Sequence, residues 1–250
     1  MRQPPSCARG ASSRGQDGGI CHGDCSRNTD RAFAGAASEK GASSTVAFVT
    51  LILFLIAGGF VVRAVVPYFL SYDAAHFGPY WPKRFGILGH MTFGTIAILT
   101  GPFQLWSGLR RKHMQVHRWI GRVFVIACLI SAGFAYYMAL TPSFGWAYGL
   151  GLAGLATAWV TCTLIGYYAV RRATVELHRR WMIRAYVVTF GFVIYRMLQD
   201  LMGWAGVQDI VLINLVAAWT CWSVPLLATI VVEGVADVTK ASRRRRPSHA

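Results

Sequence analysis

Two histidines with matching surroundings are the residues whose spacing points most directly to chemistry. Arg110-Arg111, five residues and His117-Arg118 recur as Arg171-Arg172, five residues and His178-Arg179. Two neutral imidazoles on facing helices can hold a b-type haem, and neighbouring arginines can bind its propionates. The repeat therefore predicts a haem b site in a redox protein, with a cofactor-binding set made of His117, His178, Arg122 and Arg184.

A second interpretation of the same histidines needs no cofactor. Each lies where a basic turn meets a long apolar segment. A His-Arg pair at such a boundary also suits contact with lipid headgroups. A structural or lipid-contact role for His117 and His178 therefore stays open beside haem ligation.

Ionisable residues inside the apolar segments form another candidate site. His90, Arg196 and Asp200 all fall in the halves of their segments that lie away from the Arg-Arg turns. Such groups are costly in hydrocarbon unless they pair or face a hydrated interior, so we expect them to bind a substrate in a small-molecule transporter or binder. Arg196 and Asp200 are four residues apart, on one helix face, and are expected to pair. Arg63 is expected to extend to the membrane interface.

The connection between the first two apolar segments adds polar groups on the same side. Tyr72, Asp73 and His76 lie there, beside the aromatic pair Tyr80-Trp81. Paired aromatic residues at this depth are typical of an interfacial belt. We therefore expect this connection to contribute to an outward-facing pocket.

The elements that must position these residues are long apolar segments. Of 250 residues, 54% are apolar and only 14% are charged, a balance that does not suit a water-facing surface. Crossing the hydrocarbon core as an α-helix takes roughly 20 mostly apolar residues. The segments of this kind are 45–70, 85–106, 119–140, 146–170, 181–202 and 210–232. The predicted fold is all-α: a polytopic membrane bundle of six transmembrane helices, with a parallel repeat of two hairpins.

The distribution of charge predicts the orientation. A net charge of +15 would favour nucleic acid in a soluble protein, yet the basic residues gather at the second and fourth connections and after the last span. The positive-inside rule then places both termini and both Arg-Arg turns in the cytoplasm. The expected partners are the lipid bilayer and anionic lipids at the cytoplasmic face, with no nucleic acid. The sequence leaves the oligomeric state open.

The polar ends of the chain are predicted to lie outside the bundle. Residues 1–43 read as a disordered cytoplasmic tail, 44–235 as the six-helix transmembrane domain and 236–250 as a basic cytoplasmic tail. The stretch Cys21-His22-Gly23-Asp24-Cys25 offers soft ligands, but four ligands are needed for a structural zinc site, so no metal site is predicted. Cys128, Cys162 and Cys221 lie inside spans and are expected to pack as small residues.

Gly101-Pro102 lies near the inner end of the second span. Proline removes a helical hydrogen bond and kinks the helix. The carbonyl that loses its partner is expected to engage Gln104 or a neighbouring helix.

Several short motifs, read in order, resemble one family. They are Gly89-His90, the run from Leu99 to Gln104, Arg110-Arg111, the run from His117 to Arg122 and the run from His178 to Arg184. The pattern is similar to that of the bacterial predicted membrane proteins grouped as domain of unknown function 2306. The resemblance covers about Phe85 to Arg196 and implies a multi-pass protein of the bacterial inner membrane. It implies no activity.

Enzyme classes with recognisable motifs find no support in the sequence. It lacks a Gly-x-Ser-x-Gly elbow, a His-Glu-x-x-His pair and a phosphate-binding loop of the Gly-x-x-x-x-Gly-Lys-Ser/Thr type. No residue is assigned a catalytic role. Three classes remain: a haem-binding redox protein, a small-molecule transporter or binder, and a structural or lipid-interacting membrane protein.

Overall fold

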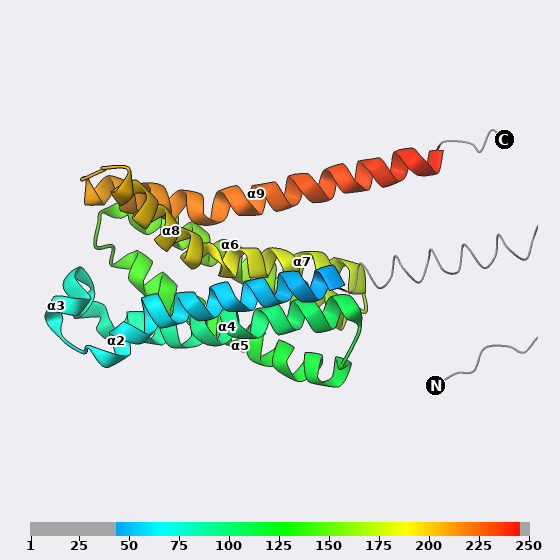
Figure 1. Ribbon diagram of the computed structural model, residues 1–250, viewed down its shortest axis with the longest axis horizontal. Coiled ribbons are helices and arrows are strands. Elements are labelled where there is room, and N and C mark those ends of the chain that lie inside the picture. Colours follow the sequence, from blue (N-terminus) through cyan, green and yellow to red (C-terminus); the bar gives the residue numbers. More distant parts are fainter. Residues whose placement is uncertain (1–43, 246–250) are drawn as a thin grey trace, which may run out of the picture. The chain divides into compact units, whose positions relative to one another are not determined.

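The computed structural model of the chain describes residues 44–245 and confirms the predicted all-α bundle (Figure 1). Its 6 helical segments that are long and apolar enough to cross a membrane are Ser44–Leu70, Ala74–Arg110, Met114–Leu140, Trp146–Arg171, Val175–Trp204 and Ile210–Ser242. The cysteine-rich stretch 21–25 and the last residues, 246–250, lie outside the described residues. The division into tails and a transmembrane domain therefore stays a prediction.

Within these segments the elements follow one another with short connections. Residues 44–60 are α-helical. The elements after them are the π-helix η1 (Val61–Val65), α2 (Val66–Leu70), α3 (Ala74–Phe77), the 3₁₀-helix η2 (Gly78–Lys83), α4 (Arg84–Arg110), α5 (Met114–Leu140), α6 (Trp146–Arg171), α7 (Val175–Thr189), α8 (Gly191–Trp204) and α9 (Ile210–Arg245). Most run a few residues beyond the predicted apolar segments. Arginine is a good helix former, so the basic flanks continue the helices beyond their apolar parts.

The centre of the bundle is a ring of four helices. α4 packs on α5, α5 on α6, α6 on α7, and α7 closes the ring against α4, while α9 covers α6, α7 and α8. Small residues such as Ala97, Ala127 and Ala132 fill the contacts beside the larger Phe124 and Trp159. Close approach through small residues is how helices gain packing contacts in lipid. Many large apolar side chains face outward, as a lipid environment requires.

The two hairpins, α4–α5 and α6–α7, turn in the same way. The Lys112 amide donates to the Ser107 carbonyl at 3.1 Å, and the Thr174 amide donates to the Ala169 carbonyl at 3.0 Å. The residue before each donor has a positive φ, which is 50° for Arg111 and 58° for Ala173. Both helices therefore end in the same kind of C-terminal cap. We call the end of the bundle with these two turns the basic end, and the opposite end the distal end.

The carbonyl freed by the proline of the second span is satisfied by another helix. Pro102 has no amide hydrogen to donate to the Ile98 carbonyl. The Tyr186 hydroxyl, from α7, donates to that carbonyl at 3.1 Å. Gly101 makes room for the ring, since a Cβ atom there would lie 1.8 Å from Tyr186 Cε2. A neighbouring helix, rather than Gln104, satisfies the freed carbonyl.

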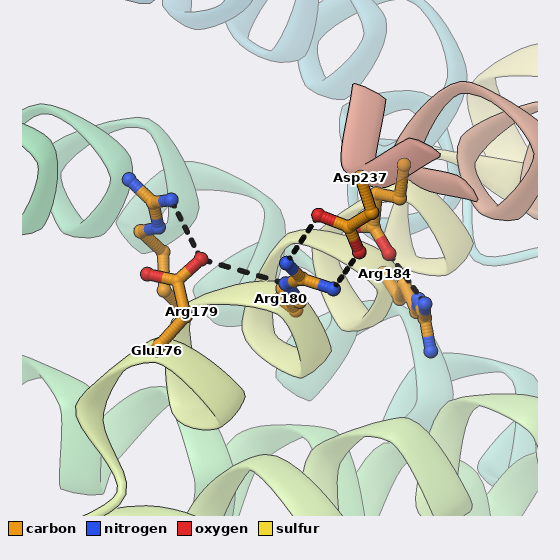
Figure 2. Close-up of polar contacts among 6 residues, drawn as sticks. Glu176, Arg179, Arg180, Arg184 and Asp237 are labelled. Carbon is orange, nitrogen blue, oxygen red and sulfur yellow. Dashed lines mark hydrogen bonds and ion pairs between the residues drawn. The ribbon is translucent and has the colours of Figure 1, made fainter. Parts of the chain in front are cut away.

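The last helix is held to α7 by charge. α9 has 36 residues and is therefore about 54 Å long. It extends past the α4–α5 turn at the basic end (Figure 1). Arg180 binds both carboxylate oxygens of Asp237, at 2.6 and 2.8 Å, and Arg184 pairs with Glu233 one turn further along (Figure 2).

Candidate functional site

The distal half of the bundle contains a cavity of about 470 Å³. Its walls come from the first span, η2, α4, α5, α6, α8 and the start of α9. Most of the lining is apolar and much of it aromatic, including Phe60, Phe144, Trp159 and Phe192. Ligand sites usually combine such a lining with a few polar groups that fix orientation. We call this space the distal cavity.

A chain of polar side chains runs along one wall of the distal cavity. Arg196 Nη1 donates to Gln199 Oε1 at 3.2 Å, and Gln199 Nε2 donates to Asn214 Oδ1 at 2.9 Å. Asn214 Oδ1 also accepts a hydrogen bond from the Tyr195 hydroxyl. All four residues line the cavity. α8 and the first turns of α9 thus present linked polar groups to it.

Two more tyrosines continue this chain to the other side of the cavity. The Tyr195 hydroxyl lies 3.5 Å from that of Tyr148 on α6, and the Tyr148 hydroxyl lies 3.2 Å from that of Tyr80 in η2. Arg196 Nη2 donates to the Tyr68 hydroxyl at 3.5 Å. The hydrogen-bond partners of this cation, Gln199 and Tyr68, are therefore both neutral.

His90 supplies a polar group on α4. It is 6% exposed, and its Nδ1 lies 3.0 Å from both the carbonyl oxygen and the hydroxyl oxygen of Ser131. Because the carbonyl can only accept, Nδ1 carries the proton and Nε2 carries the lone pair in the neutral ring. Within the described part of the chain, Nε2 has no hydrogen-bond partner. The Thr95 hydroxyl, also in the cavity wall, is buried without a hydrogen-bond partner among the described residues.

The predicted pair of Arg196 and Asp200 does not form. Asp200 Oδ2 instead accepts from Arg63 Nη2 at 2.8 Å. The two side chains share a helix face, as their spacing predicts, but Arg63 on the first span takes the carboxylate. Of the predicted substrate-binding residues, His90 and Arg196 line the distal cavity and Asp200 does not. In the first connection, His76 also lines it, while Tyr72 and Asp73 do not.

The two repeated histidines take corresponding positions at the basic end. Both are half-buried in the first turns of their helices. His178 Nδ1 donates to the Gly166 carbonyl at 2.8 Å. His117 Nδ1 lies 2.9 Å from the Ser107 hydroxyl, which is also 2.7 Å from the Phe103 carbonyl. In the neutral His178 ring Nε2 therefore keeps its lone pair, and among the described residues neither Nε2 atom has a hydrogen-bond partner.

The arginines predicted beside these histidines take matching positions. Arg122 stacks on Trp119 and Arg184 on Trp181, each with 4.7 Å from guanidinium carbon to ring centre. Their charges are compensated differently, because Arg184 pairs with Glu233 whereas Arg122 has no carboxylate partner in the described part of the chain. The described residues contain no group of three or more His, Cys, Asp or Glu side chains placed to hold a metal ion.

The sequence did not point to the tyrosines of the distal cavity as site residues. Tyr80 was expected in an interfacial belt, and Tyr148 and Tyr195 lie inside predicted spans, where the prediction considered only the ionisable side chains. A detectable signal existed: Tyr195, Arg196 and Gln199 lie within one helical turn of each other, and Asn214 lies one turn into the next helix. Polar residues clustered at one depth in neighbouring spans indicate a shared pocket.

These features define a class: a multi-pass α-helical membrane protein with an internal cavity at one end of the bundle. The chain belongs to the family of predicted membrane proteins DUF2306, whose model matches residues 87–232, more than half of its length. The resemblance seen in the sequence is thereby confirmed. The match includes His90, both repeated histidines and Arg196. Neither a curated protein nor a solved structure matches the chain.

Proposed function

We propose that this membrane protein binds a small, largely apolar molecule in the distal cavity. The observation that carries the proposal is the cavity itself: about 470 Å³ inside the bundle, with an aromatic wall facing a linked chain of polar groups. The apolar wall favours burial of a ligand's hydrocarbon or aromatic body. The polar chain and His90 Nε2 supply hydrogen bonds that would orient the ligand.

A transporter would bind the same molecule in the distal cavity and also carry it across the membrane. The α4–α5 and α6–α7 hairpins carry the same kind of basic turn, which supports two parallel halves. Transporters built from such repeated halves hold their substrate between the halves and move one against the other. Binding is the step common to a binder and a transporter, so binding is what the first experiment measures.

The test uses a neutral probe and two matched glycine variants. We expect tritiated 2-naphthalenemethanol to bind the purified full-length chain saturably in a scintillation proximity assay. Gly94→Leu places a side chain at the cavity wall and should abolish binding, whereas Gly133→Leu, where a Cβ atom would meet nothing within 4 Å, should preserve it. Binding that is not saturable, or that survives Gly94→Leu, would contradict the proposal.

A second candidate function, haem b binding in a redox protein, concerns the basic end. The supporting observation is that Nδ1 of each histidine is held by the preceding helix: His178 donates to the Gly166 carbonyl, and His117 Nδ1 lies 2.9 Å from the Ser107 hydroxyl. Histidines that bind metals usually have their other nitrogen held in this way. Arg122, which no described carboxylate neutralises, is then the arginine better suited to a propionate, and Arg184 the second.

Absorption spectra test this second candidate. Protein from haem-replete cells should show a Soret band that shifts on reduction. His117→Ala and His178→Ala should each remove the band. His113→Ala, in the same basic turn, should keep it. A colourless wild-type protein would rule the haem site out.

The basic end also fits a membrane surface. Seven of its cationic side chains have no carboxylate partner among the described residues: Arg110, Arg111, Lys112, Arg118, Arg122, Arg171 and Arg172. Each such charge near an anionic leaflet contributes about 1 kcal/mol. This supports placing the basic end and both termini in the cytoplasm, the chain in an inner membrane, and anionic lipids around its turns.

A further inference from the structure

The charges around the distal cavity are of one sign. Lys83 and Arg196 line it, and none of the described residues that line it is an aspartate or glutamate. Lys83 Nζ donates to the Thr141 carbonyl and to the Ser143 hydroxyl, the latter at 2.9 Å, so its hydrogen-bond partners are neutral. The wall therefore carries positive charge that no described side chain of the cavity compensates.

Arg196 is the cation at the centre of the polar chain. Its hydrogen-bond partners, Gln199 and Tyr68, are both neutral. Asp200 is the carboxylate on α8 best placed to pair with Arg196, but it pairs with Arg63 instead. A guanidinium in an apolar surrounding is stabilised strongly by an anion that binds it directly.

We propose that the ligand of the distal cavity is a free organic acid: a carboxylate on an aromatic or aliphatic body, bound by Arg196. The inference rests on the proposed function, since it names the ligand class of the same cavity. The carboxylate accepts hydrogen bonds from the guanidinium and from the neighbouring tyrosine hydroxyls. The body of the acid lies against the aromatic wall, where Phe144, Trp159 and Phe192 contribute.

A series of isosteric probes separates charge from shape. Naphthalene-2-carboxylate, 2-naphthalenemethanol and 2-naphthylmethylamine differ chiefly in the charge of one small substituent. In phosphatidylcholine nanodiscs we expect the carboxylate to bind about tenfold more tightly than the alcohol, as a charge-assisted hydrogen bond implies. The amine should bind more weakly than the alcohol.

Two variants test the role of Arg196, and a third variant serves as the control. Arg196→Gln should abolish the preference for the carboxylate. Gln199→Glu keeps the arginine but gives it an internal carboxylate, so it should abolish the preference as well, which guards against a simple folding defect. Arg118→Gln, the same change as the first at the basic end, should leave the preference intact.

The outcomes distinguish this inference from the proposed function. Equal binding of carboxylate and alcohol, both lost in Gly94→Leu, would overturn the organic acid while leaving the cavity as a binding site. Failure of every probe to bind saturably would overturn both. An anionic lipid as the natural occupant would reveal itself if adding phosphatidylglycerol to the nanodiscs displaced the carboxylate, and this too would overturn the free acid.

Discussion

Arg63 on the first span holds Asp200 on α8, with 2.8 Å between Nη2 and Oδ2. Asp200 lies one helical turn from Arg196, so two arginines are within reach of one carboxylate. The pair that forms joins the first span to α8. It also leaves the charge of Arg196 available to the distal cavity.

This competition predicts an effect of a residue outside the cavity wall. Arg63→Gln frees Asp200 to pair with Arg196 four residues earlier. Such a pair competes with a bound anion, so the affinity for naphthalene-2-carboxylate should fall about two- to fivefold, the range for an exposed ion pair. The scintillation proximity assay measures this directly.

The double variant supplies the control. Arg63→Gln with Asp200→Asn removes the competing carboxylate and should restore the wild-type affinity. If the double variant binds no better than Arg63→Gln alone, the freed carboxylate is not the cause of the loss.

Gly101 should be among the least replaceable residues of the bundle. In Gly101→Ala the new Cβ atom meets the Tyr186 ring at 1.8 Å, and forced overpacking costs about 3 kcal/mol. Unfolding by SDS titration in mixed micelles measures the loss. Gly133→Ala, where the new atom meets nothing within 4 Å, should change stability by less than about 0.5 kcal/mol. Equal stability of the two variants would contradict the close contact.

The ion pair of Arg184 with Glu233 should contribute more to the stability of the protein than the exposed pair of Arg179 with Glu176. The Arg184 and Glu233 side chains are 16% and 19% exposed, and Nε of Arg184 already lacks a partner in the described part of the chain. Glu233→Gln leaves a largely buried charge unpaired and should cost about 2 kcal/mol. Arg179→Gln alters a half-exposed pair and should cost less than about 0.5 kcal/mol. SDS titration of both variants shows whether this order holds.

The orientation of the chain can be tested at two connections. A reporter fused after Ser143 should report the outside, and one fused after Glu176 should report the cytoplasm, because arginines cluster only around the second site. The two fusions serve as controls for each other. If they report the same compartment, the predicted topology is wrong.

The sequence was sufficient to predict the helices and their order. Lipid requires every backbone polar group to be satisfied within a helix, so a long apolar segment has one available structure. The free carbonyl of Ile98 was also predictable from local chemistry, because Pro102 has no amide hydrogen to donate to it. The identity of the donor was not, because Tyr186 lies 88 residues further along the chain.

The candidate sites were predictable only in part. Depth along a span can be counted from the sequence, and so His90 and Arg196 were placed in one layer. Which partner an ionisable group finds depends on helix rotation and packing, which decided that Asp200 meets Arg63. The same holds for Tyr148 and Tyr195, whose hydroxyls meet across helices that no local pattern relates.

The contact between Tyr186 and the Ile98 carbonyl bears on how the protein is made. The second and third spans emerge from the ribosome before the fifth. Until Tyr186 has been synthesised, its ring cannot fill the space at Gly101 and its hydroxyl cannot donate to the Ile98 carbonyl. The α4–α5 hairpin is therefore completed by the α6–α7 hairpin of the same chain. This contact can form only after the fifth span has been synthesised, and the two hairpins play different parts in it: one supplies the space at Gly101 and the free carbonyl, and the other supplies the Tyr186 side chain.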